Sequence, residues 1–159
     1  MATIRRASQN KRQSAGILLF RDSEAELEVF LVHPGGPFWA KKDAGAWSIP
    51  KGEYSGDEDP LAAAKREFEE ETGVAIQGDF ISLGEVKQAG GKLVKAWAVK
   101  HDLDPSILKS NTFTLEWPPK SGKMREFPEV DSGEWFSIAV AREKIIKAQE
   151  EFLTRLASH

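Results

Sequence analysis

The stretch from Gly52 to Val74, GEYSGDEDPLAAAKREFEEETGV, decides the fold expected of this chain. Within it, residues 60–72 are predicted to form the strongest helix in the sequence. Asp59 is a favourable N-cap residue, and the proline that follows it is tolerated in a first helical turn. Gly73 suits the left-handed position that ends many helices. The stretch therefore predicts a loop, a helix and a turn, in that order.

Three carboxylates of this helix are expected to share one narrow face. Because a helix turns by about 100° per residue, Glu71 lies about 40° and Glu70 about 60° from Glu67, whereas Glu69 points to the opposite side. Like charges at this spacing repel. A bound hard cation explains the cluster best, and Mg²⁺ takes oxygen ligands, with Mn²⁺ as the alternative. The competing interpretation is a solvated acidic face.

The bulk composition bounds the class of protein. A length of 159 residues fits one domain. The absence of cysteine excludes disulfides, thiolate metal sites and a cysteine nucleophile, and it fits the cytoplasm that we expect as the location. No apolar run approaches the ~20 residues that span a bilayer, so no membrane partner is expected. The net charge of -3 gives no global attraction to nucleic acid, so an anionic substrate needs a local positive site or a metal.

The remaining sequence predicts a mixed α/β fold. Residues 1–13 hold four cationic side chains and no acid and are expected to be a flexible basic tail, with a targeting or nucleic-acid-binding arm as the alternative. Residues 14–159 are expected to form a single domain. Strands are predicted at residues 14–20, 27–33, 47–49, 80–87, 92–101, 112–117 and 134–137, a loop at 34–46 and a second helix, with room for one break, at 140–156. This order indicates a mixed sheet between helical layers.

The Gly52 to Val74 stretch resembles the Nudix box, in which glycine, glutamate, Arg-Glu, Glu-Glu and a final glycine stand at fixed spacing. Every fixed position is filled, by Gly52, Glu58, Arg66, Glu67, Phe68, Glu70, Glu71, Gly73 and Val74. The resemblance implies a Nudix-type α/β/α sandwich with a mixed sheet. It also implies a Mg²⁺-dependent hydrolase that cleaves a phosphoanhydride bond in substrates built as a nucleoside diphosphate linked to another group.

The resemblance assigns roles by position. Glu67, Glu70 and Glu71 would bind the metal, and Glu67 and Glu70 would act in catalysis with support from Arg66 and Glu58. One carboxylate, on the helix or on a loop, would be the general base. Family members that cleave oxidised nucleotides carry a further metal-binding glutamate shortly before a Glu-Trp strand. In this chain Glu129 resembles that residue, and Glu126 is the alternative.

The substrate side of the resemblance lies before the box. WSIPKG, which ends at Gly52, is similar to the lead-in of diadenosine-polyphosphate and diphosphoinositol-polyphosphate hydrolases. Lys51 and Lys42 are expected to contact phosphate, and Phe38 and Trp39 to stack on a base. For the two aromatic residues the alternative is packing over the sheet edge.

Subfamily markers downstream of the box are missing. Members that cleave diadenosine polyphosphates place a tyrosine, and ADP-ribose members a proline, near the position where this chain has Ala89, Gly90 and Gly91. We therefore expect dinucleoside polyphosphates or nucleoside triphosphates as substrates, followed by inositol pyrophosphates. A non-catalytic nucleotide-binding domain ranks last, because such domains commonly lose box carboxylates. We expect a monomer or a homodimer with no stable nucleic-acid partner.

Overall fold

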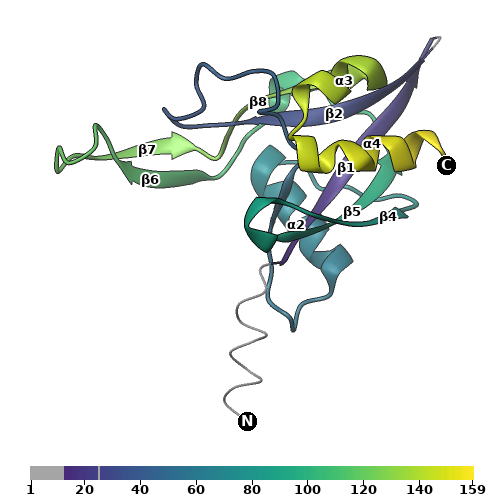
Figure 1. Ribbon diagram of the computed structural model, residues 1–159, viewed down its shortest axis with the longest axis horizontal. Coiled ribbons are helices and arrows are strands. Elements are labelled where there is room, and N and C mark those ends of the chain that lie inside the picture. The colour runs from purple at the N-terminus through teal and green to yellow at the C-terminus, as the bar shows by residue number, and fades with distance from the viewer. Residues whose placement is uncertain (1–12, 25) are drawn as a thin grey trace.

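A computed structural model describes residues 13–24 and 26–159 of the chain. A mixed β-sheet forms its centre, with helices on both faces (Figure 1). The strands are β1 (Gln13–Ser23), β2 (Glu26–Pro34), β3 (Lys51–Glu53), β4 (Ile81–Lys87), β5 (Leu93–Lys100), β6 (Thr112–Glu116), β7 (Met124–Pro128) and β8 (Val130–Ser137). The α-helices are α2 (Pro60–Thr72), α3 (Ile138–Lys144) and α4 (Glu150–Ala157), and short 3₁₀ turns span Ala89–Gly91, Pro105–Ile107 and Lys147–Gln149. The basic tail predicted for residues 1–13 lies outside the described residues, except that Gln13 begins β1.

The main sheet has the order β4-β5-β1-β2-β8, and β3 joins it beside β1. Along one edge, strand β1 pairs with β5 in parallel. Along its other edge it pairs with two strands, β3 and β2. Near its beginning it pairs with β3, where Gly16 lies opposite Lys51, and near its end it pairs with β2, where Phe20 lies opposite Val29. Because β2 and β3 pair with different parts of this edge of β1, the chain can enter the sheet at Lys51, just before Gly52. After β3 it leaves the sheet and continues into α2.

Close approach explains the glycine at position 16. A Cβ atom on Gly16 would lie 2.6 Å from the carbonyl oxygen of Pro50 and 2.7 Å from the Cβ atom of Lys51. Real Cβ atoms do not come so near to backbone, so a larger residue would push the segment that precedes Gly52 away from β1. The position of the box therefore depends on a residue in the first strand.

Two apolar cores lie on opposite faces of the sheet. Side chains alternate along a strand, so Ile17 of β1 packs with Phe68 of α2, whereas Leu18 packs on the other side with Phe152 and Leu153 of α4. All of these side chains are buried. The predicted α/β/α sandwich with a mixed sheet is thereby confirmed.

Helix α2 has the ends that its sequence predicts. The side chain of Asp59 accepts a hydrogen bond from the Ala62 amide at 3.0 Å, and Gly73 closes the helix with a φ of 80°. Ala64 and Phe68 are buried, as expected for the apolar stripe. Because this stripe is fixed against the sheet, the acidic face beside it is turned toward the end of β3 and the segment after β7.

The strand predicted at residues 47–49 is not a regular strand. Trp47 and Ser48 make only single bridges, to Ile145 and Val32, and regular pairing begins at Lys51 in β3. The same segment interrupts the terminal helix. The Ile146 amide donates a hydrogen bond to the Trp47 carbonyl at 2.8 Å and not to a carbonyl of the preceding helical turn. The single break expected there is an extended segment followed by a 3₁₀ turn.

The hairpin β6–β7 projects from the main body (Figure 1). Strand β6 was expected, but β7 was not, since most of its side chains are exposed and form no buried periodic face.

The last strand begins at Val130 rather than Glu134. The first two strands come closer together in the sequence than the predicted ranges 14–20 and 27–33, because β1 continues to Ser23 and β2 starts at Glu26. No helix in the described part of the chain has the length and apolarity needed to cross a bilayer.

Candidate active site

Arg66 connects three of the acidic side chains of the box. Its Nε and Nη2 atoms donate to the two carboxylate oxygens of Glu58, each at 2.9 Å, and its Nη1 atom donates to Glu67 at 2.8 Å. A longer contact of 3.4 Å reaches Glu70. The hydrogen bond from Arg66 lowers the pKa of Glu58. Arg66 therefore fixes Glu58 as a charged partner and holds the neighbouring carboxylates in place.

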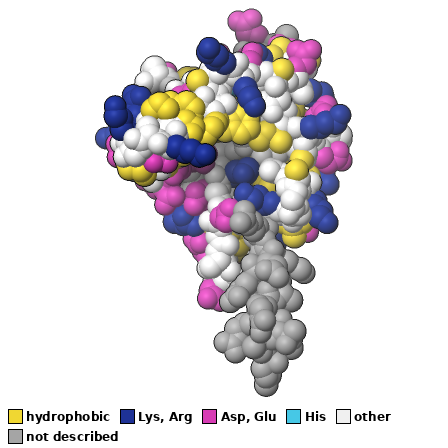
Figure 2. Space-filling model, turned by 60° about the vertical axis from the view of Figure 1, so that its left-hand side comes forward, with side chains coloured by type: hydrophobic (Ala, Val, Ile, Leu, Met, Phe, Trp, Pro, Cys, Tyr) yellow, Lys and Arg dark blue, Asp and Glu magenta, His cyan; other side chains and the backbone are white. Residues whose placement is uncertain are grey.

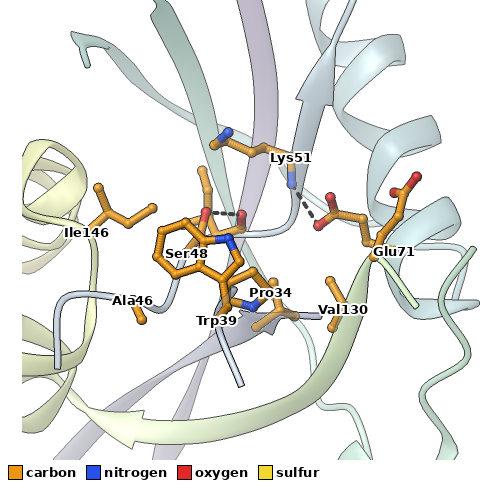
Figure 3. Close-up of a pocket in the computed structure, with 11 residues that line it drawn as sticks. Pro34, Trp39, Ala46, Ser48, Lys51, Glu71, Val130 and Ile146 are labelled. Atoms are coloured by element: carbon orange, nitrogen blue, oxygen red, sulfur yellow. Dashed lines mark hydrogen bonds between the residues drawn. The ribbon is translucent and has the colours of Figure 1, made fainter. Parts of the chain in front are cut away.

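Glu71 lies deeper than the other acids of α2. Its Oε1 atom accepts a hydrogen bond from the backbone amide of Lys51 at 3.2 Å (Figure 3). Burial raises the pKa of Glu71 to about 8, and the charges of Glu129 and Glu67 raise it as well. A cation close to such a carboxylate would favour its charged form by compensating for the lost water.

Glu67 lies directly against the backbone of the box. A Cβ atom built on Gly52 would lie 1.8 Å from Oε2 of Glu67, which explains why the box has glycine here. Burial raises the pKa of Glu67, and the charges of Glu70 and Glu129 raise it further. Gly52 thus leaves room for a carboxylate at the point where β3 meets α2.

Glu129 approaches the helix from a distant part of the sequence. It lies between β7 and β8, where its carbonyl oxygen accepts a hydrogen bond from Gly35 and its amide donates to Asn111. Partial burial of the side chain raises its pKa, and the charge of Glu70 raises it too. The alternative acid, Glu126, is in β7 opposite Thr114. Of the two, Glu129 is the residue that the structure brings beside the box.

The acids are near one another but do not all point at one position. Within residues 13–24 and 26–159, no group of three Asp, Glu, His or Cys side chains is arranged to hold an ion. The reason is local, since Glu67 is bonded to Arg66 and Glu71 to the Lys51 amide. Convergence of Glu67, Glu70 and Glu71 on one cation therefore stays a prediction.

A cavity of about 190 Å³ opens beside Glu71 and Glu129 (Figure 3). The segment over residues 34–51 supplies most of its lining, and the rest comes from β2, α2, the start of β8 and the segment after α3. Its lining residues are Val32, Pro34, Trp39, Ala46, Ser48, Ile49, Lys51, Glu71, Glu129, Val130 and Ile146. The cavity thus joins two acids to an apolar and aromatic wall.

The four expected substrate-binding residues are placed differently. Lys51 and Trp39 line the cavity. Burial lowers the pKa of Lys51, and nearby Lys92 lowers it further. The Lys42 ammonium lies 5.2 Å from the centre of the Trp39 ring, outside the cavity lining. Phe38 is also outside it, and its ring packs edge-on against Trp117 at 5.3 Å.

His33 anchors the wall that carries these residues. Its ring is buried and lies within hydrogen-bonding distance of Asp131 at 2.9 Å and of the Lys42 carbonyl at 2.6 Å. It also contacts Trp47 edge-on. These contacts give His33 a structural role, because both ring nitrogens are occupied by the protein itself.

Gln149 is a site residue that sequence reasoning missed. It is fully buried, its Oε1 atom accepts from the Ile49 amide at 3.0 Å, and its Nε2 atom donates to Ser48 and to Gln88, each at 3.0 Å. These bonds fix the cavity wall two residues before Lys51. The only signal in the sequence is a polar residue on the apolar side of the terminal helix, which does not by itself indicate its partners.

Comparison with known proteins places the chain in a family. A model of the NUDIX domain matches residues 10–156, so the chain belongs to the NUDIX domain family. The family expected from the box is thereby confirmed.

Solved structures and one curated relative resemble the chain. C. elegans Ap4A hydrolase in a binary complex is 19% identical over 91% of this chain and 96% of that chain, with a TM-score of 0.64. The NUDIX domain of Shewanella oneidensis NrtR, crystallised with ADP ribose, is 16% identical over 93% and 87%, also with a TM-score of 0.64. These likenesses show the fold.

An octanoyltransferase of Myxococcus xanthus is 30% identical over 101 residues, which are 64% of this chain but 25% of that protein. The chain thus spans about a quarter of the length of this relative.

Replacing Gly52 with alanine should reduce activity more than stability. The new Cβ atom would displace the Glu67 carboxylate, which is the mobile end of a side chain, so the backbone can stay in place. A displacement of about 1 Å in a reacting site can lower the rate on the order of 100-fold. Gly56→Ala is the matched control, because nothing lies within 4 Å of its Cβ position. Steady-state kinetics and thermal unfolding of both variants would test this, and unchanged kcat/KM in Gly52→Ala would contradict the assigned contact.

Replacing Gln149 with leucine should weaken both the fold and substrate binding. The change keeps a side chain of similar size but leaves the buried Ile49 amide without its acceptor, which costs about 1–3 kcal/mol. We expect a lower free energy of unfolding in urea and a higher KM, because the wall before Lys51 is released. Gln77→Leu at an exposed position is the control. Wild-type KM and stability in Gln149→Leu would show that the amide does not hold the wall.

Proposed function

We propose that this chain is a Mg²⁺-dependent hydrolase that cleaves a phosphoanhydride bond in nucleoside-diphosphate-linked substrates, foremost dinucleoside polyphosphates or nucleoside triphosphates. One observation carries the proposal. Glu71 of the box helix and Glu129 border the same cavity that Lys51 and Trp39 line. The cavity therefore combines acids for a metal, a cation for phosphate and a ring for a base.

The donor set suits Mg²⁺. All the candidate ligands are carboxylate oxygens, which Mg²⁺ prefers, together with phosphate oxygens of a substrate and water. Glu67, Glu70, Glu71 and Glu129 would hold the ion, and Mn²⁺ is the alternative. Burial and the charges of neighbouring acids raise the pKa of Glu67, Glu71 and Glu129, which fits a site whose negative charge a divalent cation would compensate. When bound, Mg²⁺ polarises phosphoryl oxygens and lowers the pKa of an attacking water.

The chain's own residues orient the reaction. Arg66 holds Glu58, Glu67 and Glu70 by charge-assisted hydrogen bonds. The Lys51 amide holds Glu71. Hydrolysis forms a bond from a water oxygen to phosphorus and breaks the anhydride bond, while a carboxylate accepts the water proton. Glu70 has only a long contact to Arg66. Glu70 and Glu129 are thus the least restrained of these acids, so we assign the general base to one of these two.

The other cavity wall would bind the rest of the substrate. Lys51 lines this wall, and its own backbone amide holds Glu71. Its ammonium group is therefore suited to bind a phosphate next to the metal. Trp39 offers an exposed ring for a nucleobase. The names of the similar structures, an Ap4A hydrolase and an ADP-ribose-bound domain, support a nucleotide substrate.

A hydrolysis screen tests the proposal. Nucleoside triphosphates, dinucleoside polyphosphates, ADP-ribose and inositol pyrophosphates would be incubated with the protein and Mg²⁺, and phosphate-containing products would be separated. We expect turnover of the first two classes and none with EDTA. Preferred turnover of inositol pyrophosphates would select the alternative substrate. A complete lack of metal-dependent turnover would favour a non-catalytic nucleotide-binding domain.

Glu70→Gln should lower activity far more than Glu69→Gln. Both changes keep the shape and remove a charge, but only Glu70 lies on the acidic face and contacts Arg66, whereas Glu69 is exposed. Loss of an outer partner of a metal site costs about 10–100-fold, and loss of a ligand should exceed that. The measurement is kcat at saturating Mg²⁺, with circular dichroism to check folding. Equal losses in the two variants would refute the assignment of the face.

Lys51→Ala and Trp39→Ala should each impair substrate binding. The lysine change removes the ammonium but keeps the backbone amide that holds Glu71, so it isolates the phosphate contact. A hydrogen bond to a charged group contributes about 1.5–3 kcal/mol, and stacking on a base about 1–3 kcal/mol, so kcat/KM should fall roughly 5- to 100-fold. Lys41→Ala, at an exposed position outside the cavity lining, is the control. Unchanged kinetics in both variants would place the substrate elsewhere.

A further inference from the structure

The cavity continues into an exposed aromatic surface. Trp39 lines the cavity and is 39% exposed, and the next ring, Phe38, is 60% exposed and packs on the half-buried Trp117, which directly follows β6. Figure 2 shows a band of hydrophobic side chains that crosses this side of the molecule, with Lys and Arg side chains beside it. We call the three residues Trp39, Phe38 and Trp117 the aromatic band. It links the catalytic cavity to the projecting hairpin.

Cationic side chains accompany the aromatic band from both of its segments. The loop carries Lys41 and Lys42, and the hairpin segment WPPKSGKMR, which begins at Trp117, carries no acid. Within the described residues, none of its cations forms an ion pair; they are Lys41, Lys42, Lys120, Lys123 and Arg125. The nearest acid in the loop, Asp43, is already paired with Lys144. The surface therefore has positive charge available for a partner.

Several of these cations share a face with aromatic rings. The Lys42 ammonium lies over Trp39, and the Arg125 guanidinium lies 5.8 Å from the centre of the Phe127 ring. Arg125 also pairs across the hairpin with Leu115, two residues before Trp117. Because side chains two apart in a strand point to the same face, rings and positive charges alternate on one side of the hairpin.

We propose that the aromatic band and the cations around it form a binding surface for single-stranded nucleic acid, a partner that the net charge of the whole chain does not predict. A chain of phosphates matches the unpaired cations, and unpaired bases can stack on exposed rings. A duplex would hide its base faces from these rings. The overall net charge of -3 provides no general attraction to such a polyanion, so the local positive surface has to supply it. This function goes beyond the cleavage reaction, and it does not depend on which anhydride is hydrolysed.

Fluorescence anisotropy with a labelled oligonucleotide tests this surface. The probe is an oligouridylate of roughly 12 nucleotides, within the ~4–16 nucleotides that single-strand sites cover, with a 5′ dye and no anhydride bond. The full chain is titrated in EDTA, so binding is measured without hydrolysis. We expect saturable binding that weakens with salt, with a slope of about -0.7 per phosphate contacted. A duplex of the same length should bind more weakly.

Two kinds of variant separate the parts of the surface. Phe38→Ala should weaken binding about 5-fold or more, because the most exposed ring of the aromatic band, 60% exposed, is lost as a stacking platform. Lys120→Ala combined with Lys123→Ala should make the salt slope shallower by about 1.4, which corresponds to two phosphate contacts. Lys87→Ala combined with Lys100→Ala removes the same charge from β4 and β5 and should leave the slope unchanged. Thermal unfolding of each variant checks the fold.

Three results would overturn the proposal. They are absence of oligonucleotide binding by the wild type, an equal loss in the control pair, and binding to vesicles of anionic phospholipid with none to the oligonucleotide. The last result would assign the surface to a membrane. Because the probe contains no anhydride bond and the titration is done in EDTA, these outcomes are independent of the hydrolysis screen, and failure of either test leaves the other interpretable.

Discussion

Mutual repulsion among four carboxylates is the constraint on which the site depends. Glu67, Glu70 and Glu71 lie on one face of α2, and Glu129 approaches them from the end of β7. Burial raises the pKa of Glu67, Glu71 and Glu129, and the charges of neighbouring acids raise these three pKa values further. Such a cluster would destabilise a bare helix. The surrounding structure offsets it in two ways, since the Arg66 guanidinium neutralises the outer acids and the Lys51 amide donates to the inner one. The remaining negative charge is what a divalent cation would compensate.

The pairing of the strands in the sheet brings the cavity wall and the acidic helix α2 close together. Because β1 shares an edge between β2 and β3, the chain can pass from the cavity wall into the sheet at Lys51 and from there into α2. Glycines permit the close contacts, at Gly16 against Pro50 and at Gly52 against Glu67. The buried amide of Gln149 then fixes the wall from the opposite layer. The positions of the acids are thus set by backbone contacts in the sheet as well as by the helix that carries them.

The helix, its ends and its acidic face could be predicted from the sequence, because capping, apolar spacing and helical rotation are local properties. Glu129 could be suggested only through the family resemblance, since a contact between distant segments leaves no periodic signal. The network of Gln149, Ser48 and Gln88 could not be predicted, because a single polar residue does not identify its partners. Strand β7 was missed for a related reason. Its exposed side chains carry no alternation that burial would impose.

The most direct measurement is a crystal structure of the protein with Mn²⁺, in which anomalous scattering locates the ion. We expect that at least two of Glu67, Glu70 and Glu71 contact the ion, directly or through one water, and that the ion lies at the cavity lined by Lys51 and Glu129. Binding of the ion would require Glu67 to turn from Arg66 toward the metal. An ordered ion at another position, with these carboxylates unchanged, would contradict the central claim that their repulsion is resolved by a shared cation.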